Sequence, residues 1–504
     1  MVGARRLRPR TQDVTTVGVG VVAAAVYVLH GFGGALTRDL AIYAYAGQQV
    51  ADGVPPYVGI VNRAGPLAHL IPGIGAAGAR LVGVEELTGM RVLFLAISVA
   101  CVCMVYVVGR DLFASRRAGL AAAAAFLSFH GFIEYASDGP REKTAMVLFL
   151  LCTLHALGRQ RWFVAGLWLG LGTLTWQPML FTGLAAALVM TAVAGRRWWR
   201  ELLLFAAGGL SALAACLAYF ALVGAVQEFL EGFVLLNARY RGADPPIGQI
   251  GQRWGYLVNG YGISLVFIIV GFLAILVLAL SALRRQRWWR DETAIPVVAA
   301  GACALAGFAW SLRDFNAWPD LFVVLPLAAL GVGGAVEWLA GLAPRRWGQA
   351  VVATSVTVAC VIAVQYSLSS RHHALDKQQD SVDAALRILP AGSTVMSVEA
   401  PQPLVLADLT NPTRFQTFSR GLDDYVDDTW PGGIEGFAQD VAEREPTLVA
   451  VGGGMPRWLA PTIDAEYRYV GKAPQWAWWV HQSIGRTAIA DLRAALKNAN
   501  AAGA

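Results

Sequence analysis

Long apolar stretches separated by clusters of arginine recur along the first three quarters of the chain, and they constrain its fold more than any other feature. The stretches approach the roughly 20 apolar residues that a helix needs to cross a bilayer. The sequence of 504 residues is 56% hydrophobic and only 15% charged, which is more apolar than the roughly 45–50% typical of soluble domains. We therefore predict an all-α polytopic membrane protein.

Eleven apolar spans are predicted, with basic loops between them. They are Val14–Leu36, Met90–Gly109, Ala118–Ala136, Thr144–Gly158, Trp162–Trp176, Pro178–Gly195, Glu201–Val223, Ile263–Leu283, Ala294–Trp310, Asp320–Gly341 and Gln349–Ser367. Arginine and lysine are retained on the cytoplasmic side, and from Arg110 onward the clusters occur at every second loop. This parity requires Gly65–Gly83, which is rich in glycine and proline, to be a re-entrant or interfacial segment. The N-terminus, with the first span as an uncleaved anchor, then lies in the cytoplasm and the C-terminus outside.

The last quarter of the chain has a different character. Residues 371–504 carry 12 basic and 16 acidic residues, whereas residues 1–370 carry 28 and 18. Helix-like runs at Lys377–Leu389 and Gly433–Arg444 alternate with short strand-like runs, which predicts a small α/β layer structure. The strand-like runs are Thr394–Val398, Pro403–Ala407, Thr447–Val451, Tyr467–Val470 and Trp476–Val480. We divide the chain into a membrane domain (1–370), an external α/β domain (371–482) and a C-terminal tail (483–504).

Two further patterns carry little functional information. The six cysteines all lie in apolar segments, so they predict neither a disulfide framework nor a metal site. The run Gly452-Gly453-Gly454 follows a strand-like segment, but it lacks the lysine of a phosphate-binding loop. The chemistry is therefore expected to come from the external loops.

Four predicted external loops, at residues 37–64, 137–143, 224–262 and 311–319, should converge on one face of the membrane domain. Their charged residues include Arg38, Asp39, Asp52 and Arg63; Asp138, Arg141, Glu142 and Lys143; Arg239, Arg241, Asp244 and Arg253; and Arg313 and Asp314. A carboxylate among cations at a membrane surface suits a reaction in which a hydroxyl attacks and a lipid-bound phosphate leaves. Asp39, beside the first membrane exit, is the candidate catalytic base.

The external segments also resemble a known family. After Asp39 the chain reads YxxxGxxVxxGxPPY, from Tyr43 to Tyr57, and then a Gly-Pro-Leu turn at Gly65; later come GRDLFASRRAGLAAAAAFL and the acidic loop SDGPREK. This order is similar to the first and second external loops of C-type glycosyltransferases of the protein O-mannosyltransferase and lipid A aminoarabinose transferase kind. The resemblance covers roughly residues 14–370 and implies the C-type fold.

The resemblance implies roles for individual residues. Asp39 matches the base that deprotonates the acceptor hydroxyl, and Asp138 matches the acid of the second loop. The family often has Asp-Glu at the first site, where this chain has Leu40 after Asp39, and a lysine before the proline turn, where this chain has Arg63. The loop 224–262 corresponds to the mobile loop that closes over donor and acceptor. Substrate binding is assigned to Tyr57, Arg63, Arg141, Lys143, Arg239, Arg241, Arg253 and Arg313; no metal ligand is assigned, and the sequence leaves a divalent cation undecided.

Each candidate also has a structural alternative. Asp39 could cap the helix that follows it, because aspartate is a favoured N-cap. Asp138 precedes Gly-Pro and could be an ordinary turn residue. Asp52 lies in a turn-like sequence and is interpreted as structural, and a lone histidine such as His69 is more often packed than a metal ligand. Arg141 and Lys143 could merely pair with Glu142 or with headgroup phosphate.

The sequence as a whole predicts a membrane glycosyltransferase. It would move mannose or an arabinose-like pentose, with inversion, from a polyprenyl-phosphate carrier to a glycan, lipid or protein acceptor on the external face of a bacterial plasma membrane, with no nucleic acid as partner. A transporter or lipid flippase is the first alternative; it should place ionisable residues in mid-helix, and the span centres here have almost none. A non-catalytic envelope-assembly protein, the second alternative, would tolerate loss of Asp39.

Overall fold

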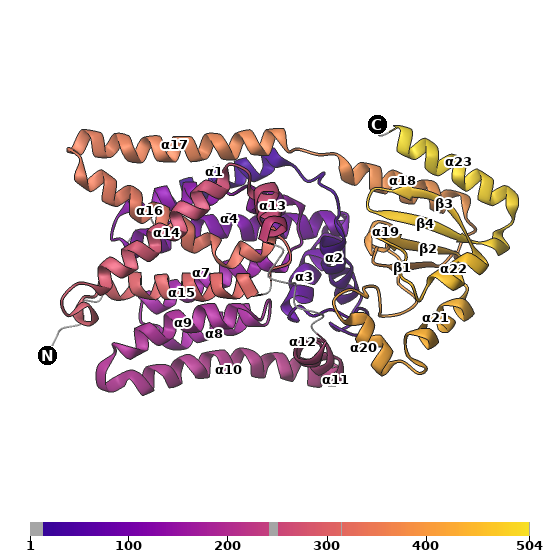
Figure 1. Ribbon diagram of the computed structural model, residues 1–504, viewed down its shortest axis with the longest axis horizontal. Helices are drawn as coiled ribbons and strands as arrows, with labels where there is room; N and C mark the ends of the chain where they lie inside the picture. Colours follow the sequence, from indigo (N-terminus) through magenta and orange to yellow (C-terminus); the bar gives the residue numbers. More distant parts are fainter. Residues whose placement is uncertain (1–13, 241–249, 314, 503–504) are drawn as a thin grey trace.

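The computed structural model describes residues 14–240, 250–313 and 315–502 and shows a helical bundle at one end of the molecule and an α/β domain at the other (Figure 1). The bundle and its loops contain α1 (Val14–His30), α2 (Arg38–Ala51), α3 (Leu67–Val82), α4 (Glu86–Leu112), α5 (Arg116–Leu127), α6 (His130–Asp138), α7 (Glu142–Gly158), α8 (Trp162–Thr173), α9 (Met179–Ala192), α10 (Trp198–Leu222), α11 (Val226–Phe229), α12 (Leu236–Arg239), α13 (Ile250–Tyr261), α14 (Ser264–Leu283), α15 (Ala294–Arg313), α16 (Leu325–Leu342) and α17 (Arg345–Ser369). A π-helical turn (Leu230–Leu235) precedes α12, and a 3₁₀ turn, η5 (Trp318–Val323), precedes α16.

Each predicted apolar span coincides with helical structure. Within the described residues, six helices are long and apolar enough to cross a membrane: α4, α10, α14, α15, α16 and α17. The span predicted at Ala118–Ala136 is instead a helix pair, α5 and α6, bent by 71°. At the bend, the backbone N–H of His130, the first residue of α6, donates to Ser264 Oγ on α14. The other four spans are the shorter helices α1, α7, α8 and α9, so the count of eleven crossings stays a prediction.

Close backbone contacts hold the bundle together. A Cβ added at Gly166 on α8 would lie 1.8 Å from the carbonyl oxygen of Phe205 on α10. A Cβ added at Gly331 on α16 would likewise lie 1.8 Å from the carbonyl oxygen of Gly271 on α14. Small residues at such crossings allow the tight helix packing that is typical of membrane proteins.

The helices α2 and α3 lie at the end of the bundle that faces the α/β domain (Figure 1). They pack on each other, and α3 also packs on α4. The 16 residues of α3 include Pro72, and the helix is of similar length to α8 and α9, which are predicted to cross. Length therefore does not separate α3 from those helices, and the non-crossing role of Gly65–Gly83 stays a prediction.

The α/β domain is a four-stranded sheet with helices on both faces. Its elements are α18 (Ala374–Ile388), β1 (Val395–Val398), α19 (Gln402–Ala407), α20 (Leu422–Thr429), α21 (Gly433–Arg444), β2 (Leu448–Gly452), α22 (Ala460–Glu466), β3 (Tyr467–Ala473), β4 (Trp476–His481) and α23 (Arg486–Ala502). The strand order is β1-β2-β4-β3, in which β1 and β2 are parallel and the other pairs antiparallel. Side chains on one face pack with α18 and α23, and those on the other pack with α21 and α22.

Two segments of this domain differ from the sequence-based expectation. The strand predicted at Pro403–Ala407 is wrong, because this segment is the helix α19, and proline is well tolerated in the first turn of a helix. The segment 483–504, set apart as a tail, contains α23, whose Leu492 and Leu496 are fully buried in the core of the domain.

The α/β domain is docked on the bundle through α2 and the segment before it. Gln378 on α18 accepts a hydrogen bond from the backbone N–H of Leu36 and donates one to its carbonyl. The hydroxyl of Tyr45 accepts from the backbone N–H of Asn411 at 3.1 Å. Helix α2 is therefore fixed between the two parts of the molecule, and the residues at its start lie where they meet.

Candidate active site

The start of α2 is built around a threonine cap. Thr37 has extended backbone angles, and its Oγ1 accepts a hydrogen bond from the backbone N–H of Leu40 at 3.4 Å. Asp39 lies in the first helical turn, where the helix dipole favours a negative charge. The alternative that Asp39 is the helix cap is therefore wrong, and its carboxylate is oriented by other partners.

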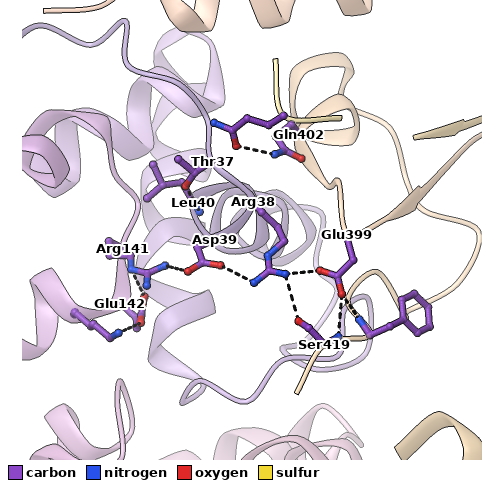
Figure 2. Close-up of polar contacts among 12 residues, drawn as sticks. Thr37, Arg38, Asp39, Leu40, Arg141, Glu142, Glu399, Gln402 and Ser419 are labelled. Atoms are coloured by element: carbon purple, nitrogen blue, oxygen red, sulfur yellow. Dashed lines mark hydrogen bonds and ion pairs between the residues drawn. The ribbon is translucent and has the colours of Figure 1, made fainter. Parts of the chain in front are cut away.

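Those partners are two arginines. Arg141 Nη1 lies 2.8 Å from Oδ2 of Asp39, and Arg38 Nη2 lies 3.4 Å from its Oδ1 (Figure 2). The Asp39 side chain keeps 44% of its surface exposed, whereas that of Arg141 keeps 6%. Burial alone would raise the pKa of Asp39, but the charges of Arg141 and then Arg38 outweigh it and hold the pKa well below its usual range. Asp39 is thus a half-exposed carboxylate that is ionised at neutral pH.

Arg141 is fixed by its own surroundings. It precedes the first residue of α7, and its guanidinium lies 5.8 Å from the ring centre of Tyr43 and 5.6 Å from that of Tyr135. Its Nε lies 3.3 Å from Oε2 of Glu142. Burial would lower the pKa of Arg141, but the charges of Glu142 and Asp39 raise it. A permanent cation is thus held against Asp39.

The charges continue on both sides of this pair and alternate in sign. Lys143 lies between Glu142 and Asp320 of η5 and also faces the ring of Trp176 at 5.0 Å. On the other side, Arg38 Nη1 lies 2.5 Å from Oε2 of Glu399 in the α/β domain (Figure 2). We call the whole set the charge network; its members are Glu399, Arg38, Asp39, Arg141, Glu142, Lys143 and Asp320.

Glu399 joins the charge network to a loop of the α/β domain. Its Oε1 accepts hydrogen bonds from the backbone N–H groups of Phe418, at 2.7 Å, and Ser419, at 2.9 Å. Neither Glu399 nor Asp320 was predicted as a site residue. Asp320 carried a signal, because it is a carboxylate at the first residue of a predicted apolar span; Glu399 carried none, because its partner Arg38 is 361 positions away.

Asp138 is placed differently. Its side chain is only 8% exposed and accepts a hydrogen bond from the backbone N–H of Gly34 at 3.1 Å. Its Oδ2 lies 3.4 Å from His30 Nε2, and its Oδ1 lies 4.0 Å from Arg91. In the described part of the chain, none of these partners belongs to the charge network. The geometry favours a structural role for Asp138 in fixing the segment between α1 and α2.

Tyr57 and Arg63 also serve packing. The Tyr57 ring is buried against His69, with ring centres 5.0 Å apart, and its hydroxyl donates to the carbonyl of Ala64 at 2.7 Å. Arg63 donates to the backbone carbonyls of Tyr240 and Arg420, so it links three segments. His69 is fully buried, and the described residues contain no group of three or more His, Cys, Asp or Glu that could hold a metal ion.

The remaining predicted phosphate ligands come from the third and fourth loops. Arg239 is exposed at the end of α12. Arg253 on α13 donates to the carbonyl of Leu312 at 3.1 Å, next to Arg313, whose guanidinium lies 5.9 Å from the ring centre of Trp310. Arg241 lies outside the described residues. The structure therefore brings Asp39, Arg141 and Lys143 together, whereas no described contact joins the other candidates to them.

Comparisons with known proteins support the expected class. Residues 68–220, from α3 to α10, match the family model described as dolichyl-phosphate-mannose-protein mannosyltransferase. No curated protein sequence matches the chain. The chain is similar to the crystal structures of ArnT from Cupriavidus metallidurans in the apo state (TM-score 0.62, 15% identity) and bound to undecaprenyl phosphate (TM-score 0.61, 16% identity). Each alignment covers 92% of this chain and 97% of the ArnT chain.

The resemblance to C-type glycosyltransferases is thereby confirmed, and the chain has the fold of a membrane protein of that class. The likeness to ArnT extends over the α/β domain as well as the bundle, since it spans nearly the whole of both chains. At this level of identity the likeness establishes the fold, so the chemistry has to be argued from the site itself.

Proposed function

We propose that the protein is a membrane glycosyltransferase that moves a sugar from a polyprenyl-phosphate carrier to an acceptor hydroxyl, with Asp39 as the general base. The observation that carries the proposal is the pairing of a half-exposed Asp39 with the buried Arg141, at the end of the bundle. A general base has to reach a hydroxyl that arrives from outside the protein. Within the charge network, Asp39 meets this requirement best, because the side chains of Glu142 and Asp320 are almost fully buried.

Arg141 has a second task in this proposal. The donor is a phosphodiester with one negative charge, and displacement at the anomeric carbon leaves a polyprenyl phosphate with an additional charge. A guanidinium binds phosphate oxygens well and stabilises the charge that develops on the leaving oxygen. When donor phosphate shares the Arg141 guanidinium, Asp39 loses part of its counter-charge and becomes a stronger base.

The reaction is then a direct displacement. The acceptor oxygen forms a bond to the anomeric carbon, the bond from that carbon to the phosphate oxygen breaks, and the acceptor proton passes to Asp39. Attack from the face opposite the phosphate inverts the anomeric centre. Lys143, held by Asp320, fixes the loop that presents Arg141. The sequence-based proposal that Arg239, Arg241, Arg253 or Arg313 adds positive charge for the phosphate is kept without a contact among the described residues to support it.

The donor class rests on two supports. The matched family model is described by a dolichyl-phosphate-mannose donor, and the similar ArnT structure contains undecaprenyl phosphate. The acceptor side is proposed to be a glycan, lipid or protein of a bacterial envelope, and the sugar mannose or an arabinose-like pentose. Mass spectrometry of envelope glycans, with and without the protein, tests the assignment. Identical glycans, together with no sugar transfer from polyprenyl-phosphate donors by the purified protein, would overturn it.

The proposed site faces the outside of the cell. If the arginine distribution sets the orientation, an Asp464→Cys variant in the α/β domain is labelled in intact cells by an impermeant thiol reagent, whereas an Ala114→Cys variant between α4 and α5 is labelled only after the cells are opened. Both positions are exposed, and the unmodified protein serves as the blank. Labelling of the Ala114→Cys variant from outside would reverse the orientation.

A further inference from the structure

A cavity of about 520 Å³ lies between the start of α2 and the α/β domain. This volume falls within the range of about 300–1,000 Å³ that is usual for small-ligand sites. Of the residues that line the cavity, Arg38 belongs to the bundle and all the others belong to the α/β domain. The cavity therefore lies where the two parts of the molecule meet, and the proposed catalytic step does not use it.

The cavity lies at the carboxyl ends of the two parallel strands. Glu399 directly follows β1, and Gly452 to Gly454 end and follow β2; all four residues line the cavity. In sheets with parallel strands, ligands characteristically bind outside the carboxyl ends of the strands. The topology of the domain therefore places the cavity at the position where such a fold binds ligands.

The three glycines shape this wall of the cavity. A Cβ at Gly452 would lie 2.0 Å from the carbonyl oxygen of Glu399, so only glycine allows the two strand ends to approach each other here. Gly453 has φ +68°, which glycine adopts without strain. A Cβ at Gly454 would meet no atom within 4 Å. Because glycine has no side chain, the run Gly452 to Gly454 leaves this side of the cavity unfilled.

The lining groups are those that recognise a sugar. Trp458 packs against Phe418, with ring centres 4.8 Å apart, and provides an aromatic wall. Gln402 is fully buried, and its Oε1 has no hydrogen-bond partner among the described residues. The charged lining groups balance: Arg38 and Arg457 against Glu399 and Asp423. A saccharide has apolar C–H faces and a rim of hydroxyls that both donate and accept, so it matches this mixture better than a polyanion would.

We propose that this cavity binds the saccharide part of the acceptor. This inference rests on the proposed function and adds the class of acceptor and its site. The guanidinium of Arg38 touches both regions, since it pairs with Glu399 in the cavity wall and with Asp39 in the charge network (Figure 2). The Arg38 guanidinium thus lies between a saccharide in the cavity and the proposed base, and the proposal requires a terminal hydroxyl of that saccharide to extend past Arg38 to the half-exposed Asp39.

Direct binding tests this inference without turnover. The purified full chain is titrated with mannotetraose, an arabinofuranose hexasaccharide, chitotetraose and cellotetraose, and binding is followed by calorimetry. We expect saturable binding of at least one of them by the unmodified protein. Binding should be lost in a Gly454→Phe variant, whose ring occupies the cavity, and kept in a Gly158→Phe variant, whose Cβ also meets no atom within 4 Å but which ends α7 away from the cavity.

Two further variants keep the test informative if Gly454→Phe does not fold. Asp423→Asn and Arg457→Gln change exposed lining residues, and each should weaken binding by about 10-fold if it removes one charge-assisted hydrogen bond of about 1.5 kcal/mol. Binding of none of the four probes, or binding unchanged in all three cavity variants, overturns the inference.

The test also separates this inference from the proposed function. An Asp39→Asn variant should bind the saccharide like the unmodified protein but transfer sugar about 10²–10⁴-fold more slowly. Sugar transfer with an acceptor KM unchanged in Gly454→Phe would leave the enzyme assignment intact and remove the cavity as the acceptor site. Saccharide binding that depends on Gly454, without any sugar transfer by the unmodified protein, would keep the saccharide site and remove the transferase assignment.

Discussion

Asp39 and Asp138 both belong to predicted external loops, yet the protein holds them in opposite ways. Asp39 is half exposed and faces two arginine side chains, whereas Asp138 is buried and accepts a hydrogen bond from the backbone of Gly34. The sequence motif finds both carboxylates equally well. Both carboxylates have a nearby cation, so the difference between them is access: the Asp39 side chain is 44% exposed and that of Asp138 is 8% exposed.

The largest expected effect tests the first member of this comparison. Asp39→Asn keeps the size of the side chain and removes the proton acceptor, so turnover should fall by about 10²–10⁴-fold, the usual contribution of general base catalysis. Sugar transfer from a polyprenyl-phosphate donor is measured together with the melting temperature in detergent. Because Thr37 caps α2, the substitution should leave folding intact.

Asp52→Asn is the matched control for this experiment. Asp52 ends the same helix and pairs at the surface with Arg80 at 2.7 Å, an interaction worth about 0–1 kcal/mol. The sugar-transfer activity of the Asp52→Asn variant should stay near that of the unmodified protein. Normal transfer by a stable Asp39→Asn variant would remove the base assignment.

The next effect concerns the cation beside the base. Arg141→Gln removes a charge-assisted contact of about 1.5–3 kcal/mol, so use of the donor should weaken by about 10- to 150-fold. The kinetic constants for the polyprenyl-phosphate donor measure this change. Arg285→Gln, which breaks an exposed ion pair with Asp291 between α14 and α15, is the control and should have no effect on donor use. Equal kinetics in both variants would contradict a phosphate role for Arg141.

A smaller effect tests the second member of the comparison. Asp138→Asn keeps an acceptor for Gly34 but removes the buried charge near His30 and Arg91, so the free energy of unfolding should fall by about 1–3 kcal/mol while the folded protein still transfers sugar. Thermal unfolding and activity per folded molecule are measured together. If turnover falls about 10²-fold with unchanged stability, Asp138 is part of the catalytic machinery and the contrast with Asp39 disappears.

The smallest expected effect is a shift in pH dependence. Because Arg141 holds the pKa of Asp39 below its usual range, the base stays ionised in mildly acidic solution, and removing Arg141 should raise that pKa toward about 3.9. The acid limb of the kcat/KM profile should therefore lie at higher pH in Arg141→Gln than in the unmodified protein. The pairing of Asp39 with Arg141 also stabilises the folded protein. This stabilisation is fully present above the pKa of Asp39 in the unfolded chain, and it is lost as the pH falls through the lower pKa of Asp39 in the folded protein. An acid limb at the same pH in both proteins would show that Asp39 does not set it.

The local features of the molecule could be predicted from its sequence. Long apolar stretches placed the helices of the bundle, and the charged residues of the predicted external loops included Asp39, Arg141 and Lys143, which the structure brings together. Alternation in the α/β domain placed β1, β2, β3 and β4 near their observed positions.

The features that depend on distant partners could not be predicted. The role of Glu399 arises from a contact with Arg38 across 361 residues, which no local pattern records. The structural placement of Tyr57 depends on rings from α3 and α11 that close around it. The helix α19 was mistaken for a strand because a short apolar run fits both periods.

The position of Arg38 has a consequence for exchanging the α/β domain between relatives of this protein. Its guanidinium pairs with Asp39 of the bundle and with Glu399 of the α/β domain at the same time. The two parts are therefore coupled through one side chain, because a graft from a relative without a carboxylate at the position of Glu399 would leave Asp39 as the remaining charged partner of Arg38 in the charge network. The surroundings of the proposed base would then depend on a single glutamate of the other domain.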